Sequence, residues 1–219
     1  LDELTYWKGN PFIQPQINHR VSLDYTKNNL SVMLSYNQLN NYFTQLLDAY
    51  KKDYIVMTIK NIGKQKQLAL DLIYNKRLTS WWDISANIGV YYFINHLDYE
   101  SYREDYRRPS CNLSLSNDIQ LPAKVRMELS ARYASKRQGR SYEVFKPSGG
   151  IDIGLSKRLL RDRLSLSLMI TDLLHTERWD SYGRKGTLEL DIWGHSESRQ
   201  VIFRVNYNFG SRKFETNKN

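Results

Sequence analysis

Residues 125–133 read VRMELSARY, and their side chains alternate between apolar and polar at every position. Successive side chains of a β-strand point to opposite faces, so this stretch predicts a strand with one apolar and one polar face. Little helical periodicity occurs anywhere in the chain. The same alternation recurs in eight further stretches, at residues 21–26, 30–36, 68–74, 84–92, 113–115, 151–156, 164–170 and 201–209.

The connections between these stretches alternate between short and long. Tight turns are expected around residues 27–29, 77–82, 121–122 and 159–162. Long loops are expected over residues 95–107, 137–146 and 174–198. Short periplasmic turns and longer extracellular loops are typical of outer-membrane β-barrels. Pro109, Pro122 and Pro147 are expected at strand starts or turns, where a missing N–H group costs little.

Residues 37–65 test this up-and-down order, because a separate strand at residues 54–57 that ends at residues 61–63 would place the tight turns at 27–29 and 77–82 on opposite sides. The order is kept if one strand runs from Asn29 to about Leu47 and the next returns from about Asp53 to Lys76, and we adopt this interpretation. Both strands then project beyond the membrane and bend near residues 61–63. The sequence therefore predicts an all-β, antiparallel up-and-down transmembrane barrel segment of about nine strands. Bacterial single-chain barrels have an even number of strands, so an odd number favours a segment of a larger barrel.

Composition narrows the function classes. No apolar run approaches the roughly 18 residues of a spanning helix, but a membrane barrel carries only a weak hydropathy signal and is not excluded. One cysteine in 219 residues excludes a disulfide framework, and the four histidines (His19, His96, His175 and His195) are dispersed, so no metal site is expected. No nucleotide-binding or hydrolase motif occurs. We therefore expect no cofactor, no catalytic residues and no enzyme.

Aromatic side chains near strand ends suit the girdles at the two membrane interfaces, where one side of the ring is apolar and the other is wet. This position favours a membrane barrel over a soluble β-barrel or sandwich, which remains the alternative at this point. The predicted interface aromatics are Tyr74, Trp81, Trp82, Tyr92, Tyr133, Tyr207 and Phe209.

Charged residues on the polar faces are expected to line the lumen. They either face a passing ligand or a plug, or they form cross-strand ion pairs along the inner wall, and ion pairing is the favoured interpretation. Arg126, Glu128 and Arg132 share one strand face, so local charge compensation is expected among them. The lumen candidates are Asp71, Arg126, Glu128, Arg132, Asp152 and Arg204.

The long loops mix aromatic residues with lysines and arginines, and the chain carries a net charge of +9. This mixture suits sugar stacking, anionic ligands or solvated loop surface. No nucleic-acid-binding motif accompanies the charge, so nucleic acid is not an expected partner. Contact with anionic lipopolysaccharide is the better hypothesis for cations that face outward.

Five segments resemble the C-terminal barrel of TonB-dependent outer-membrane receptors, in particular the outer-membrane β-barrel family abundant in Bacteroidetes. They read KGNPFIQPQ, NIGKQKQLALDL, LTSWWDISAN, LSLSLMITDLL and SRQVIFRVNYNFG. They occur in the family's order, although Gln16 replaces its usual acid, Phe12 its usual polar residue and Ala69 its frequent glycine. They begin at residues 8, 61, 78, 164 and 198.

The resemblance implies a 22-stranded barrel with an N-terminal plug, of which about nine strands lie here. It implies uptake of a large scarce ligand (an iron chelate, cobalamin, a glycan or a peptide) with energy relayed by TonB through the plug. The implied partners are outer-membrane lipids, lipopolysaccharide, the remaining barrel and plug, the barrel-assembly machinery through the last strand, and a surface lipoprotein. The expected location is the bacterial outer membrane.

The expected division of the chain follows from this resemblance. Residues 1–17 form a connecting loop, residues 18–210 form the C-terminal barrel portion, and residues 211–219 form a polar periplasmic tail. The chain begins without Met, which favours a piece of a longer protein. The alternative function is an outer-membrane barrel with an adhesion, assembly or scaffold role and no active uptake.

Overall fold

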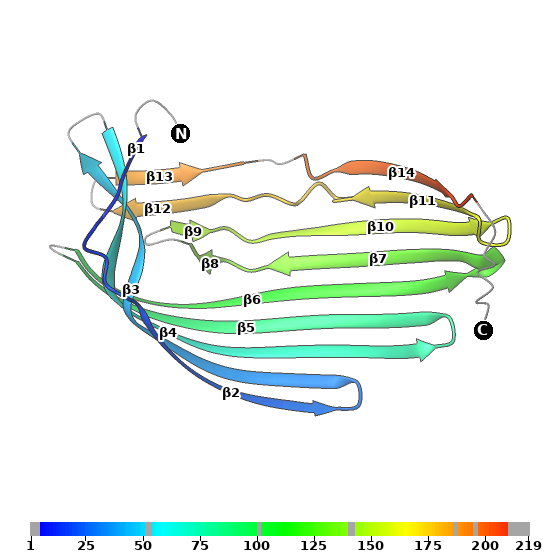
Figure 1. Ribbon diagram of the computed structural model, residues 1–219, viewed down its shortest axis with the longest axis horizontal. Coiled ribbons are helices and arrows are strands. Elements are labelled where there is room, and N and C mark those ends of the chain that lie inside the picture. The colour runs from blue at the N-terminus through cyan, green and yellow to red at the C-terminus, as the bar shows by residue number, and fades with distance from the viewer. Residues whose placement is uncertain are drawn as a thin grey trace, which may run out of the picture.

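The computed structural model describes residues 5–50, 54–99, 102–139, 143–185, 188–194 and 197–209. These residues are almost entirely β-strands (Figure 1). No helix among them is long and apolar enough to cross a membrane. His195 and the predicted tail at residues 211–219 lie outside the described residues.

Nine strands form one antiparallel path in the order β2-β3-β4-β5-β6-β7-β10-β11-β14. Within the described residues, β2 and β14 pair along one edge only, so the sheet is not closed. The predicted order of nine up-and-down strands is confirmed. The bounds are β2 Ile17–Lys27, β3 Leu30–Tyr50, β4 Tyr54–Thr79, β5 Trp82–Tyr99, β6 Tyr102–Leu121, β7 Val125–Ala134, β10 Ser148–Leu159, β11 Leu164–Thr171 and β14 Gln200–Tyr207.

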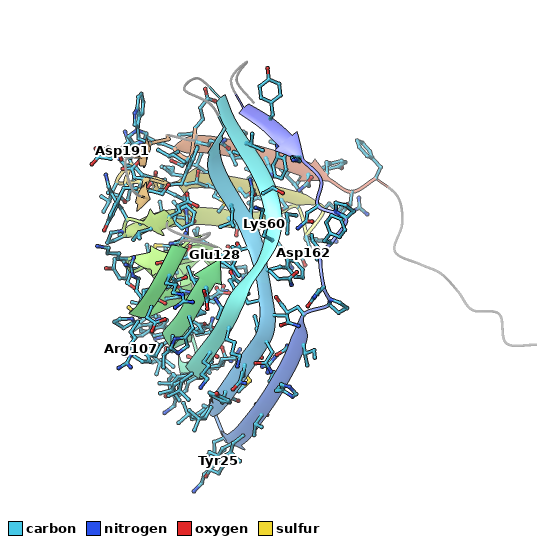
Figure 2. All side chains as sticks on the ribbon, turned by 90° about the vertical axis from the view of Figure 1, so that its left-hand side faces the viewer. Tyr25, Lys60, Arg107, Glu128, Asp162 and Asp191 are labelled. Atoms are coloured by element: carbon cyan, nitrogen blue, oxygen red, sulfur yellow. The ribbon has the colours of Figure 1, made fainter. Side chains whose placement is uncertain are left out.

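The two faces of this sheet differ in both polarity and exposure. Leu34 is 44% exposed, whereas the next residue on the polar face, Ser35, is 8% exposed. Likewise, Leu68 is 49% exposed and Ala69 is 5% exposed. The sheet is curved, and side chains project from both of its faces (Figure 2). A soluble fold buries its apolar face, so this arrangement is that of a membrane barrel wall.

The β3–β4 hairpin bends where the sequence predicted. The register shifts between Asn40 and Tyr42, and again at Phe43, opposite the stretch that contains Gly63. Gly63 has a φ of 134°, and a Cβ there would lie 2.0 Å from the His96 carbonyl oxygen. Only glycine accommodates both this backbone conformation and this approach. Both strands continue past the bend, which confirms the predicted long hairpin.

The cluster of large buried apolar side chains lies at and beyond this bend. Leu46, Ile62 and Leu97 are each at most 2% exposed, and Tyr42 and Tyr106 pack against them. These residues come from β3, β4, β5 and β6. The cluster therefore holds the ends of four strands together on the side of the long loops.

The segment expected as a connecting loop contains a short strand, β1 (Thr5–Lys8), which pairs in parallel with β4 beyond the bend. The following residues continue along the same edge of β4. The Gln14 N–H donates to Asn61 Oδ1 at 2.8 Å, and Asn61 Nδ2 donates to the Gln14 carbonyl at 3.0 Å. This edge is open because β5 pairs with β4 only up to Gly63.

The prediction of a long loop over residues 95–107 is wrong. β5 continues to Tyr99, β6 starts at Tyr102, and the two strands stay paired throughout. Pro109 consequently lies inside β6 and not at its start. Its missing N–H is tolerated because β6 pairs with β7 only from Asn112 onward, so Pro109 has β5 as its one strand partner among the described residues.

The other two predicted loops are also partly ordered into strands. β8 (Arg137–Gln138), β9 (Glu143–Phe145), β12 (Ser181–Lys185) and β13 (Leu188–Ile192) form a second sheet in the order β13-β12-β9-β8. These strands are two to five residues long, too short for alternation to be recognised. The tight turns at the opposite end are confirmed, including a single 3-10 turn at Pro122–Lys124.

Candidate functional site

The six predicted lumen residues lie on the polar face of the sheet. The strand pairing aligns Asp71 with Gly89, Glu128 with Gly154, and Arg204 with Ser167. Arg126, Arg132 and Asp152 occupy the same face because they are an even number of residues from these positions. Register thus brings the six residues onto one face of the sheet, and their role in the lumen remains a prediction.

Ion pairs occupy the half of this wall near the tight turns. Arg126 on β7 pairs with Asp118 on β6 across the strands and with Glu128 on its own strand at 3.2 Å. Arg77 pairs with Asp83 at 2.9 Å. Arg126 and Glu128 thus show the expected local compensation. These side chains are 30–71% exposed, so solvent screens the pairs and each contributes about 0–1 kcal/mol.

Arg204 differs from the other lumen cations. It forms no ion pair with any described residue, and it lines a hollow of about 210 Å³ together with Glu128 and Met169. Among the described lumen candidates, its guanidinium is the one left available to a further partner.

A groove of about 750 Å³ lies on the same face, between the ion pairs and the long loops. Asp71 and Tyr91 line it, and Tyr91 Oη donates to Asp71 Oδ1 at 2.7 Å. The phenol ring crosses Gly89, where a Cβ would lie 2.3 Å from Tyr91 Oη. Gly89 therefore leaves the space through which Tyr91 reaches Asp71.

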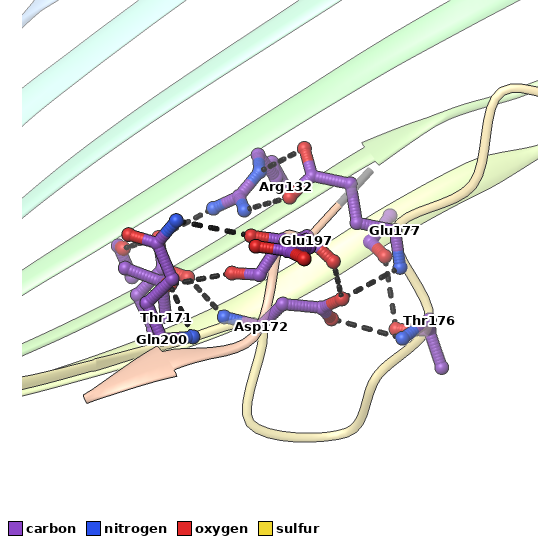
Figure 3. A network of polar contacts seen from close by, with 11 residues as sticks. Arg132, Thr171, Asp172, Thr176, Glu177, Glu197 and Gln200 are labelled. Carbon is purple, nitrogen blue, oxygen red and sulfur yellow. Dashed lines mark hydrogen bonds and ion pairs between the residues drawn. The ribbon is translucent and has the colours of Figure 1, made fainter. Parts of the chain in front are cut away.

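Arg132 forms the other side of the groove and carries two carboxylate contacts (Figure 3). Its Nη1 donates to Asp152 Oδ2 at 2.5 Å, and its Nε and Nη2 donate to both oxygens of Glu177 at 3.1 and 2.5 Å. The second contact is bidentate, which is the strong geometry for an arginine–carboxylate pair. Arg132 thus joins the barrel wall to the loop that follows β11.

The same loop is held by a buried carboxylate, Asp172, which is 0% exposed. It accepts hydrogen bonds from Ser198 Oγ at 2.6 Å and from the N–H groups of Thr176 and Glu177 at 2.9 and 3.1 Å. Its own N–H donates to Asp152 Oδ1 at 2.8 Å. Loop and wall therefore form one connected network, shown in Figure 3.

Burial and hydrogen bonding act in opposite directions on Asp172, which lies beyond the end of β11. Burial raises the pKa of this carboxyl, but the hydrogen bonds from Ser198, Thr176 and Glu177 lower it more. The net pKa lies below the ordinary value of 3.8. The carboxylate is therefore the form that the folded loop requires.

Sequence reasoning missed Asp172, Glu177 and Ser198. Asp172 ends a strand-like stretch, which is the one signal that pointed toward it. Glu177 and Ser198 lie in loops without any periodicity, so their partners depend on how the loop folds back. The sequence placed Arg132 and Asp152 on the right face but not within this network.

The seven predicted interface aromatics lie near the two ends of the apolar band. Tyr92 and Tyr133 lie toward the long loops, and the other five lie toward the tight turns. Trp82 Nε1 donates to Asn117 Oδ1 at 3.0 Å, and its ring stacks beside Trp81 with 6.1 Å between centroids. The Tyr207 and Phe209 rings meet edge to face at 4.6 Å. Their interface role remains a prediction.

An open antiparallel wall with an exposed apolar face and a charged inner face defines a segment of a membrane β-barrel. Residues 1–207 match the family described as the outer membrane protein beta-barrel family. The chain belongs to this family, and its location is the bacterial outer membrane.

The chain is also similar in structure to the FrpB iron transporter from Neisseria meningitidis (F3-3 variant). The TM-score is 0.51 at 16% sequence identity, over 93% of this chain and 33% of that one. At this identity the likeness concerns the fold. The chain therefore spans about a third of the length of that transporter. No curated protein matches the sequence.

Proposed function

We propose that this chain is the C-terminal barrel portion of a TonB-dependent receptor that takes up a large scarce ligand. The candidate ligands are an iron chelate, cobalamin, a glycan or a peptide. The observation that carries the proposal is an unclosed nine-stranded wall with a groove on its polar face, in a chain of this family. Open edges cannot persist in lipid, so further strands must complete the barrel.

The wall supports this proposal through its size and its polarity. Barrels of 22 strands enclose a lumen wide enough for a plug, and nine strands supply about two-fifths of such a wall. Asp71, Tyr91 and Arg204 then face the plug or the ligand, while Arg132 is occupied by its own loop. In this proposal energy arrives through TonB and the plug, and a surface lipoprotein is a further partner.

The last strand, β14, supports assembly. Its outward residues Val201, Phe203, Val205 and Tyr207 are all more than a third exposed. We include the barrel-assembly machinery among the proposed partners because this apolar, aromatic row near the end of the barrel offers a recognition edge. The proposal assigns the chain no enzymatic role.

Dependence on TonB is the first experimental test. Cells that express the full-length receptor are offered radiolabelled ferric siderophores, cobalamin, oligosaccharides and peptides. We expect one ligand to accumulate in cells, and we expect accumulation to fall to the level of receptor-deleted cells when tonB is removed. Surface binding should persist, because binding precedes the energised step.

One alternative remains, namely an outer-membrane barrel for adhesion, assembly or scaffolding. It predicts surface retention of a partner that is unchanged without TonB, and no accumulation of any ligand in the panel. Equal accumulation with and without TonB contradicts the uptake proposal. The soluble β-fold alternative is excluded by family membership and by the exposed apolar face.

A further inference from the structure

The outward surface of the sheet changes from apolar to basic within one step along β4, β5 and β6. Tyr92 lies directly opposite Leu68 and closes the apolar band. Two residues further out, Lys66 is opposite Ile94, which is opposite Arg107. Lys64 follows two residues beyond Lys66 on the same face. Three cations therefore lie immediately above the last aromatic row.

Two acids described on this surface, Asp105 and Asp98, already have partners. Asp105 lies 2.7 Å from His96 Nδ1, and Asp98 accepts from Arg103 at 3.1 Å. Lys64, Lys66 and Arg107, in contrast, form no ion pair with any described residue. Lys64 and Arg107 are exposed, and Lys66 is half-buried. These three residues, called the basic patch below, are therefore not compensated by a described acid.

The basic patch lies on the outer surface of the barrel wall and does not face the lumen. Arg107 lies on the outer side of the curved sheet, whereas Glu128 lies toward its inside (Figure 2). Lysine and arginine stems lie along apolar surface while their charged ends reach the interface. The tight turns face the periplasm, so the patch meets the outer leaflet. The headgroups of the outer-leaflet lipids are found at this depth of the bilayer.

The spacing of the patch suits a single phosphorylated headgroup. Neighbouring strands are about 4.8 Å apart, so the backbones of Lys66 and Arg107 are about 10 Å apart. Lys64 and Lys66 are about 7 Å apart along the strand. Long flexible side chains at these distances can converge on one phosphate group or on two neighbouring ones.

We propose that the basic patch binds the phosphorylated lipid A headgroup of lipopolysaccharide in the outer leaflet. Tyr92 and Leu68 contact its acyl chains below, and the three cations contact its phosphates above. This site is separate from the lumen and does not depend on the proposed uptake.

The test uses the full-length protein that contains this chain, purified in mild detergent. Bis-phosphorylated lipid A is titrated in, and the bound fraction is measured by native mass spectrometry. We expect the triple variant Lys64→Gln, Lys66→Gln and Arg107→Gln to raise the Kd about 100-fold, because each surface cation near anionic lipid contributes about fivefold. Lys64→Arg with Lys66→Arg should bind as the native protein does.

A matched triple variant controls for net charge. Lys27→Gln, Lys76→Gln and Lys124→Gln remove three exposed cations at the tight-turn end, and lipid A binding should stay within about threefold of native, as expected for charges more than a Debye length away. Heat-modifiable migration in gels checks that every variant is folded. Unchanged binding in the first triple variant, or an equal loss in the control, overturns the proposal.

Two further arms identify the source of the phosphate. Dephosphorylated lipid A should bind weakly to native and variant protein alike. Inorganic phosphate at millimolar concentration should not displace lipid A, because the acyl contacts are absent. Displacement by inorganic phosphate alone would overturn the assignment to a lipid.

Discussion

Replacing Ile88 by Arg is expected to prevent the receptor from accumulating in the outer membrane. Ile88 lies on β5 about midway between Trp82 and Tyr92, a stretch that matches the roughly 9–11 residues of a membrane-spanning strand. Its side chain is on the apolar face and 39% exposed, so it would contact lipid. An arginine at the bilayer midplane costs about 2–4 kcal/mol. Immunoblots of heat-modifiable protein in outer-membrane fractions measure the loss.

The neighbouring residue provides the matched control. Asn87 is also exposed but lies on the polar face, so Asn87→Arg should assemble at close to the native level. In a soluble protein both substitutions would be exposed to water, and both would be mild. Normal accumulation of Ile88→Arg, or an equal defect in Asn87→Arg, contradicts the assignment of the two faces.

Replacing Asp172 by Ala is expected to release the loop that follows β11. The substitution leaves three donors without an acceptor, each at a cost of about 1–3 kcal/mol if it stays buried. Arg178 is an exposed trypsin site in this loop. We expect cleavage there to accelerate about 100-fold, because cleavage follows the population of the opened loop. Gels of the folded, membrane-embedded protein give the rate.

The control variant Asp162→Ala distinguishes the effect of the lost hydrogen bonds from the effect of the backbone conformation. Asp162 has a φ of 68°, in the same left-handed region as Asp172 with its φ of 43°. Asp162 is exposed in a tight turn, so its replacement carries a similar backbone penalty without the lost hydrogen bonds. Cleavage at Arg178 should not change in this variant. If Asp172→Ala is cleaved at Arg178 as slowly as the native protein, the carboxylate does not hold the loop.

The pH dependence of the same cleavage follows from the lowered pKa of Asp172. The native carboxylate has a pKa below its ordinary 3.8, so its stabilisation is fully present above that value. The stabilisation is lost as the pH falls through the lower native pKa. Protection of Arg178 in the wild type should therefore hold at neutral and mildly acidic pH and disappear below about pH 4, when assayed with an acid-active protease.

Alternation and chain direction were enough to predict the wall of the barrel. The residues around 125–133 carry a strict two-residue period, and a one-residue slip would turn every apolar side chain to the lumen. Up-and-down parity then required the long β3–β4 hairpin, including its bend at Gly63. The face of each lumen charge followed from the same period.

The loops could not be predicted in this way. β9 and β12 are too short to show a period, and they pair between two loops that are distant in sequence. The contacts of Arg132 with Glu177 depend on that loop folding back on the wall. Likewise, the long loop expected over residues 95–107 is a paired extension, because its charged residues interrupt the apolar pattern without interrupting the strand.

A scan of spin labels along β5 tests the central claim most directly. Each residue from 84 to 92 is replaced in turn by a labelled cysteine in the full-length protein, except Gly89, where Tyr91 leaves no room for a side chain. Cys111 and any other native cysteine are first changed to serine. Accessibility to oxygen and to a water-soluble nickel chelate is then measured in reconstituted bilayers. The account predicts a two-residue period, with Ile88 and Val90 accessible to oxygen and Ser85 and Asn87 accessible to nickel. Uniform accessibility to nickel along β5, or the opposite phase, would contradict it.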